Sequence, residues 1–172
     1  MVKSILNLGI VLFLICGIST GLLAFVNELT APVILENTKA QELLANKEVL
    51  PDADEFYSVA EDISVGKDSS GNITGYAVKV SPYGYGGKIN MIVGIKKDLT
   101  VSGVEILSMS ETPGLGAKAQ DKAFLRQFIN KDKNMELKKD ISAISGATIT
   151  STAVTEGVKE AISKIEKSGG IK

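Results

Sequence analysis

Residues 63–80 read ISVGKDSSGNITGYAVKV, and the fold that we predict for the second part of this chain starts from their pattern. Its centre, residues 67–72, is a cluster of turn formers, and Tyr76, Val78 and Val80 beyond it alternate with more polar neighbours. Alternation with a period of two is typical of a strand with one buried face, and turn formers between two such runs favour a hairpin. Residues 63–80 therefore predict two antiparallel strands.

The period of two continues beyond this hairpin. Every second residue from Ile89 to Ile95 is apolar, a Lys-Lys-Asp turn follows at residues 96–98, and residues 101–107 form another run with the character of a strand. Short turns between successive strands favour pairing of each strand with the next. We therefore expect an antiparallel sheet at the centre of the fold.

Helical spacing replaces this alternation after residue 117. A short helix is predicted to turn one face inward, formed by Ala123, Phe124, Phe128 and Ile129. A longer helix is predicted from about residue 150 to residue 167, where steps of three and four separate Val154, Val158, Ala161, Ile162 and Ile165. Gly169 and Gly170 follow it, as glycines often follow helices. The predicted class is α+β, a twisted antiparallel sheet flanked by helices.

The first segment of the chain predicts a membrane anchor. Residues 4–27 contain no charged side chain, and the apolar run at residues 5–26 is long enough to cross a hydrocarbon core of roughly 30 Å. A cleavable signal peptide has a shorter apolar region and a small-residue site after it, and no such site follows Val26. Lys3 before the run and Glu28 after it favour a cytoplasmic N-terminus and an outer domain.

A stalk helix is expected between the anchor and the domain. Leu35, Leu43 and Val49 recur at helical steps, with Pro32 breaking the helix near its start and Pro51 ending it. The expected organisation is a transmembrane anchor at residues 1–27, a stalk helix at residues 28–50 and an extracytoplasmic domain at residues 51–172.

Composition excludes several kinds of chemistry. The chain has no His and a single Cys, Cys16, so Ser-His and Cys-His catalysis, His-ligated metals and disulfide frameworks are excluded. We interpret Cys16 as a small apolar residue within the bilayer. The 19 basic and 20 acidic residues nearly cancel, so nucleic acid is not an expected partner. A metal site made of carboxylates alone and acid–base catalysis by carboxylates stay open, although the sequence has no clustered Asp/Glu pattern of that kind. A function without acid–base work by side chains fits this composition better.

The segment SGATITS (residues 145–151) opens directly into the last predicted helix. Free N–H groups at a helix N-terminus and the positive end of the helix dipole favour a phosphate, and Gly146 lets the backbone come close. A phosphate-bearing ligand is one interpretation. In the other, Thr148, Thr150 or Ser151 caps the helix, which is the commonest use of such residues.

The quartet Ser145-Gly-Ala-Thr148 resembles the flavinylation motif of the FMN-binding domain in the G subunit of Rnf electron transport complexes. A related domain occurs in the C subunit of the sodium-translocating NADH:quinone oxidoreductase. The resemblance implies that a flavin transferase, using FAD as donor, esterifies the Thr148 hydroxyl with the FMN phosphate. Covalent FMN at Thr148 is therefore the expected cofactor.

Two further segments carry the same resemblance. ETPGLG (residues 111–116) is similar to the loop that lies against the flavin in this family, although taken alone it is an ordinary strand-to-helix turn. YGYGGKI (residues 83–89) resembles the family's glycine-rich stretch before a central strand. There Tyr83 or Tyr85 could pack on the isoalloxazine and Lys88 could meet a phosphate or a carbonyl, but such glycines also mark hairpins and bulges.

The chain departs from the family pattern at two places. Ser142 stands where the family usually has an Asp three residues before the motif serine, and Asp140 lies two positions earlier. Met109 replaces a His found in many relatives. The resemblance implies that the first change affects the efficiency of flavin attachment and the second affects the flavin potential.

The resemblance implies an electron-carrier subunit of a membrane-bound, ion-translocating ferredoxin:NAD oxidoreductase, without independent catalysis. Its partners would be the other subunits, the flavin transferase and membrane lipid. The alternatives are a membrane-tethered FMN-binding sensor or assembly module without covalent flavin, or the longer C subunit of the quinone reductase. The expected cofactor-binding residues are Tyr85, Lys88, Glu111, Thr112, Gly114, Leu115, Ser145, Gly146, Ala147, Thr148 and Thr150.

Overall fold

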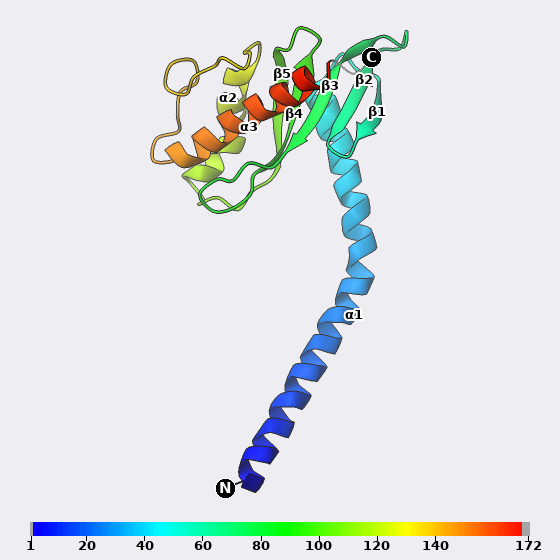
Figure 1. Cartoon of the computed structure of the whole chain (residues 1–172), viewed down its shortest axis with the longest axis vertical. Coiled ribbons are helices and arrows are strands. Elements are labelled where there is room, and N and C mark those ends of the chain that lie inside the picture. Colours follow the sequence, from blue (N-terminus) through cyan, green and yellow to red (C-terminus); the bar gives the residue numbers. More distant parts are fainter. Residues whose placement is uncertain (1, 170–172) are drawn as a thin grey trace. The chain divides into compact units, whose positions relative to one another are not determined.

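The structure is a computed structural model that describes residues 2–169. Two compact units divide the chain, one ending at Ala40 and the other beginning at Gln41. The first unit is helix alone, and the second contains the sheet and all later helices (Figure 1). We describe each unit by itself.

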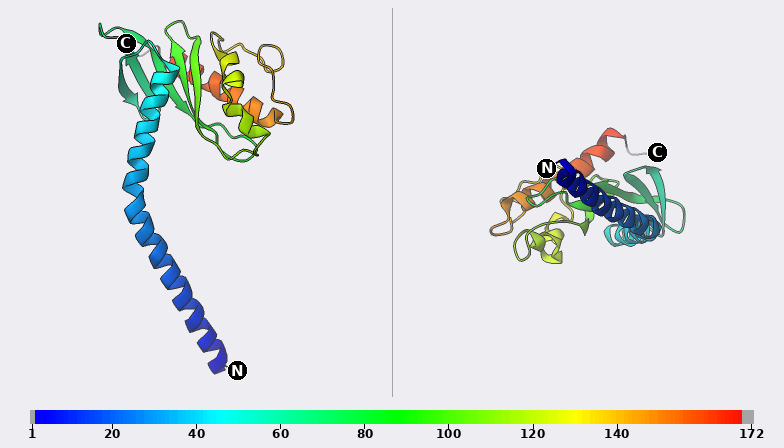
Figure 2. Two further views of the ribbon diagram at one scale, coloured as in Figure 1. Left: turned by 180° about the vertical axis from the view of Figure 1, so that it is seen from behind. Right: turned by 90° about the horizontal axis from the view of Figure 1, so that it is seen from below.

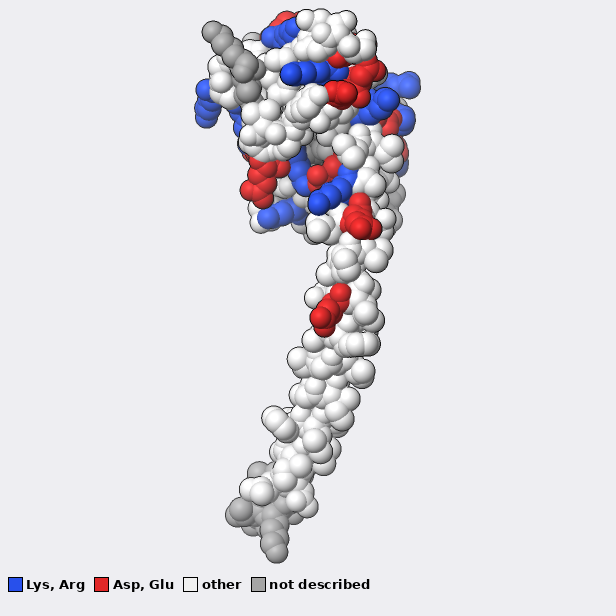
Figure 3. All heavy atoms as spheres, turned by 90° about the vertical axis from the view of Figure 1, so that its right-hand side faces the viewer, with Lys and Arg blue, Asp and Glu red and all other residues white. Residues whose placement is uncertain are grey.

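Helix α1 (Val2–Val49) is continuous and is long and apolar enough to cross a membrane. On the side shown in Figure 3, charged side chains are scattered over the second unit and are sparse along the described part of α1. The predicted break near Pro32 is wrong, because α1 runs through this residue. Proline removes one backbone N–H donor, but the helix-forming residues on both sides keep the other backbone hydrogen bonds of the helix. The helix ends before Pro51, as predicted.

A single antiparallel sheet of five strands follows, and each strand pairs with the next in sequence. The strands are β1 (Glu55–Ala60), β2 (Ile63–Lys67), β3 (Ile73–Val80), β4 (Asn90–Lys96) and β5 (Val101–Ser108). The predicted hairpin corresponds to β2 and β3, and the predicted sheet is confirmed. Strand β1 was not predicted: it is an edge strand exposed along most of its length, so its sequence lacks an apolar alternation.

Short helical segments lie between the sheet and the final helix: η1 (Gly116–Gln120), α2 (Lys122–Leu125) and η2 (Arg126–Phe128). The buried side chains here are Ala119, Phe124, Leu125 and Phe128. The predicted inward face is wrong in part, since Ala123 and Ile129 are exposed. The segment passes from an α-helical turn to a 3-10 turn, so the spacing of buried residues departs from that of one regular α-helix.

Helix α3 (Thr148–Lys167) crosses one face of the sheet, and the last turn of α1 packs on the other. Alternate residues of β3 and β4 point to opposite faces of the sheet and belong to different hydrophobic clusters. Val78 and Val93 belong to the core beneath α3, whereas Ala77 and Ile92 pack with the end of α1. Figure 1 shows α3 in front of the sheet, and the rear view in Figure 2 shows the end of α1 there instead.

Two strand glycines allow α1 to approach the sheet closely. A Cβ atom on Gly94 would lie 2.3 Å from the Val49 carbonyl oxygen, and one on Gly103 would lie 2.9 Å from the Val49 Cα. The Ser102 hydroxyl donates to the same Val49 carbonyl. The end of α1 is therefore part of the second unit. Helix α3 covers the opposite face of the sheet, and the motif that resembles a flavinylation site lies at its start.

Candidate functional site

Helix α3 begins at Thr148, after Ala147, and no side chain caps it. The interpretation of Thr148, Thr150 or Ser151 as the cap is therefore wrong. Ser151 instead accepts a hydrogen bond from the Ile144 amide at 3.0 Å and donates to the Ala147 carbonyl at 2.9 Å. These bonds hold the turn before the helix, where Gly146 has a φ of +77°.

The hydroxyl of Thr148 is exposed and forms no hydrogen bond with any residue between positions 2 and 169. The next hydroxyls along the helix are all engaged: Thr150 donates to Glu111 at 2.8 Å and Thr152 donates to the Thr148 carbonyl at 2.9 Å, in addition to the bonds of Ser151. In the first turn of α3, Thr148 is thus the hydroxyl free to react or to bind.

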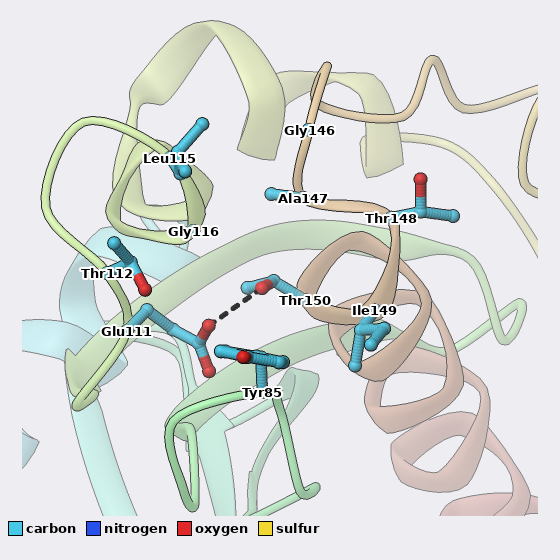
Figure 4. Close-up of a pocket in the computed structure, with 10 residues that line it drawn as sticks. All are labelled: Tyr85, Glu111, Thr112, Leu115, Gly116, Gly146, Ala147, Thr148, Ile149 and Thr150. Atoms are coloured by element: carbon cyan, nitrogen blue, oxygen red, sulfur yellow. Dashed lines mark hydrogen bonds between the residues drawn. The ribbon is translucent and has the colours of Figure 1, made fainter.

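A pocket of about 510 Å³ opens beside this turn. Three segments that are separate in sequence line it, namely the glycine-rich loop, the Pro-Gly loop and the start of α3 (Figure 4). The lining residues are Tyr85, Glu111, Thr112, Leu115, Gly116, Gly146, Ala147, Thr148, Ile149 and Thr150. The three segments singled out in the sequence therefore meet at one place.

Three of the expected site residues lie outside this lining: Lys88, Gly114 and Ser145. The Lys88 ammonium lies 5.5 Å from the centre of the Tyr83 ring. Gly114 has a φ of +75° and open space around it, so it serves the turn. Two lining residues were not among the expected ones. Gly116 ends the Pro-Gly segment already recognised, and Ile149 carries an apolar side chain that is 57% exposed on a helix.

The pocket combines apolar walls with one buried carboxylate. Tyr85, Leu115 and Ile149 are large apolar side chains, 73%, 46% and 57% exposed, and they are available to cover a flat ring. Glu111 is only 8% exposed. Thr148 lies at the rim, with its hydroxyl directed away from the other labelled side chains (Figure 4). Such a pocket suits a ligand that combines an aromatic ring with an anionic group at a helix N-terminus.

The chain departs from the family pattern at Ser142 and Met109, and the residues at and near these positions have local structural roles. The Ser142 amide donates to Gln127 Oε1 at 2.8 Å, and Asp140 Oδ2 accepts from the Glu136 amide at 2.9 Å. Asp140 thus belongs to its own loop. Met109 is half-buried and packs against the main core.

Metal chemistry has no support at this site. Among the described residues, there is no group of three or more His, Cys, Asp or Glu side chains that could hold a metal ion.

Two family descriptions match the chain. Residues 84–163 match the FMN-binding domain, and residues 1–49 match the RnfG N-terminal region. The first range contains all ten residues that line the pocket.

Similar proteins extend the match over most of the chain. The G subunit of the Na⁺-translocating ferredoxin:NAD⁺ oxidoreductase complex of Acetobacterium woodii is 36% identical, over 93% of this chain and 91% of that protein. The G subunit of the proton-translocating ferredoxin:NAD⁺ oxidoreductase complex of Clostridium ljungdahlii is 37% identical, over 87% and 85% respectively.

Solved structures are similar at the level of the fold. The C subunit of the Na⁺-translocating NADH-quinone reductase from Parabacteroides distasonis has a TM-score of 0.50 at 24% identity, over 61% of this chain and 60% of that one. NqrC from Shewanella oneidensis has a TM-score of 0.51 at 20% identity, over 66% and 67%. The predicted family is confirmed by the relatives that align over most of their length: the chain belongs to the RnfG family, the G subunits of ion-translocating oxidoreductase complexes, and carries its FMN-binding domain.

Proposed function

We propose that this chain carries electrons within a membrane-bound, ion-translocating ferredoxin:NAD oxidoreductase complex through FMN attached to Thr148 by a phosphoester. The observation that carries this proposal is the free Thr148 hydroxyl at the rim of the pocket and at the start of α3.

The residues around the pocket fit FMN. Backbone N–H groups at the start of α3 would hold the phosphate, with the helix dipole adding to the attraction. Tyr85, Leu115 and Ile149 would cover the isoalloxazine. When bound, the flavin supplies the transfer of one or two electrons, and the protein supplies attachment, orientation and electrostatics.

Attachment at Thr148 is supported by accessibility. The side chain is exposed, so a transferase can reach it, whereas Thr150 and Ser151 are buried and engaged in hydrogen bonds. Thr152 is exposed but its hydroxyl donates to the helix backbone and its side chain does not line the pocket. Among the four hydroxyl side chains between residues 148 and 152, Thr148 is therefore the expected acceptor.

We propose that α1 attaches the chain to a membrane, because it is long and apolar enough to cross one. We propose the organisation given by the sequence: an anchor at residues 1–27, a stalk within the same helix at residues 28–50 and an outer domain at residues 51–172. Lys3 and Glu28 flank the anchor and favour an N-terminus in the cytoplasm. The partners would be the other subunits of the complex, a flavin transferase during maturation, and lipid around α1.

Expression of the full chain with and without a flavin transferase tests the proposal. After denaturation, the chain made with the transferase is expected to fluoresce and to gain the mass of FMN less one water. Thr148→Ala is expected to abolish both signals, and Thr152→Ala, two residues away from the pocket lining, is the matched control that keeps them. Label that survives Thr148→Ala would contradict the assignment.

A tethered module that binds FMN without a covalent bond is the second candidate, because the same pocket could hold free FMN. In that case flavin would co-purify with the native chain and separate from it on denaturation, with or without the transferase.

A further inference from the structure

The carboxylate of Glu111 lies where the three pocket segments meet. Its Oε1 accepts a hydrogen bond from the Gly86 amide of the glycine-rich loop at 3.0 Å. Its Oε2 accepts one from the Thr150 hydroxyl in the first turn of α3 at 2.8 Å. Each oxygen thus joins the Pro-Gly loop to a different segment.

Glycines in two of these segments leave room for this carboxylate. A Cβ atom on Gly84 would lie 2.2 Å from Glu111 Oε1, and one on Gly116 would lie 2.5 Å from Glu111 Oε2. Distances this short are not tolerated between real atoms. The glycines at 84 and 116 are therefore explained by Glu111 itself, without any need for the backbone to approach a flavin.

The donors to Glu111 are neutral groups of the protein. Among the ion pairs of the described residues, none includes Glu111, and the Thr150 side chain that contacts it is 1% exposed. A hydrogen bond to a carboxylate at a buried site contributes more than an exposed one, because water cannot readily replace the lost partner. The contact is therefore suited to hold the segments in place.

We propose that Glu111 is a positioning residue: its two hydrogen bonds fix the loop that carries Tyr85 against the helix start that carries Thr148. The wall of the pocket and the attachment point then keep one relative geometry. The effect of Glu111 on FMN rests on the proposed function. Its effect on the geometry of the pocket does not, because that geometry belongs to the chain without flavin.

Glutamine at position 111 separates the hydrogen bonds from the charge. Its amide oxygen can accept from Gly86, and its NH₂ group can donate to the Thr150 hydroxyl. Alanine removes both bonds. At position 150, valine removes one bond with little change of shape, and serine keeps the hydroxyl.

Amide hydrogen exchange of the flavin-free full chain, reconstituted in detergent, tests the structural part. Glu111→Ala is expected to speed exchange at Gly86 by roughly tenfold or more, whereas Glu111→Gln stays near wild type. Thr150→Val is expected to loosen the first turn of α3, and Thr150→Ser to preserve it. Amides of β3 and β4 are the internal control and are expected to keep their protection, which shows that each variant is folded.

The chain loaded with flavin tests the consequence for the cofactor. Fluorescence anisotropy of the attached flavin is expected to fall in Glu111→Ala and to be retained in Glu111→Gln. Unchanged exchange at Gly86 in Glu111→Ala, or a Gln variant as damaged as the Ala variant, would overturn the positioning role. Absence of flavin from Thr148 in every variant would contradict the proposed function alone, since the exchange measurement needs no flavin.

Discussion

Thr150 and Glu111 are 39 residues apart in sequence, and a hydrogen bond of 2.8 Å joins the hydroxyl of one to the carboxylate of the other. This bond connects the last motif of the chain to the Pro-Gly loop. It explains why two segments with no local relation lie at the same pocket, and why a small residue is needed at several positions around them.

Substitution of Gly116 by alanine tests the room around Glu111. The new methyl group would lie 2.5 Å from Glu111 Oε2 and 2.9 Å from the Thr150 hydroxyl, so one of them has to move. We expect a loss of about 1–3 kcal/mol in the free energy of unfolding, as is typical of overpacking. Denaturant unfolding measures it. Lys118→Ala, an exposed position in the same short helix, is the control and is expected to unfold as wild type does.

Substitution of Ile149 by alanine tests the apolar wall of the pocket. Because Ile149 is 57% exposed, the change is expected to alter folding stability by less than about 1 kcal/mol. The attached flavin is nevertheless expected to become more accessible, seen as stronger quenching of its fluorescence by iodide. Val59→Ala removes a similarly exposed apolar side chain from β1 and is expected to leave the quenching unchanged.

Substitution of Phe128 by alanine tests the revised face of the short helical segment. Phe128 is fully buried and its ring lies 5.5 Å from that of Phe124 at an angle of 82°. A loss of about 3–5 kcal/mol in unfolding free energy is expected from the cavity. Ile129→Ala, next to it and 40% exposed, is expected to cost less than about 1 kcal/mol. Equal losses would restore the inward face predicted from the sequence.

The ion pair between Asp62 and Lys164 predicts a dependence of stability on pH. Lys164 Nζ lies 2.6 Å from Asp62 Oδ2, and this hydrogen bond lowers the pKa of Asp62. A carboxyl with a lowered pKa in the folded state stabilises it at neutral pH, and the effect is lost as pH falls below about 4. Since both groups are partly exposed, the contribution is expected to be below about 1 kcal/mol.

Thermal unfolding between pH 3 and pH 7 measures this contribution. Asp62→Asn is expected to melt below wild type at pH 7, with the difference shrinking toward pH 3. Asp52→Asn is the control, because the Asp52 side chain forms no ion pair or hydrogen bond with the described residues. A difference that stays constant with pH would mean that Asp62 acts through packing.

The local features of the fold could be predicted from the sequence. The alternation of Tyr76, Val78 and Val80 identified a central strand because one face of β3 is buried under α3. Strand β1 lacks such a face and carries no comparable signal. Pro32 shows the opposite error, since a local rule against proline in helices was overridden by the residues around it.

For the candidate site too, part of the arrangement could be predicted from the sequence and part could not. Three motifs pointed to Tyr85, Leu115 and Thr148, and the structure brings all three to one pocket. The partners of Glu111 could not be predicted, because its bonds to Gly86 and Thr150 span distant parts of the chain. Thr150, expected as a cofactor-binding residue, lines the pocket but directs its hydroxyl to Glu111.

Peptide mass spectrometry of the chain, purified from membranes of its native host, tests whether FMN is attached covalently to Thr148. After denaturation and digestion, we expect a peptide containing Thr148 that carries the mass of FMN less one water, with fragment ions that place the group on Thr148. A bare Thr148 peptide, with flavin released in the denaturation step, would contradict it.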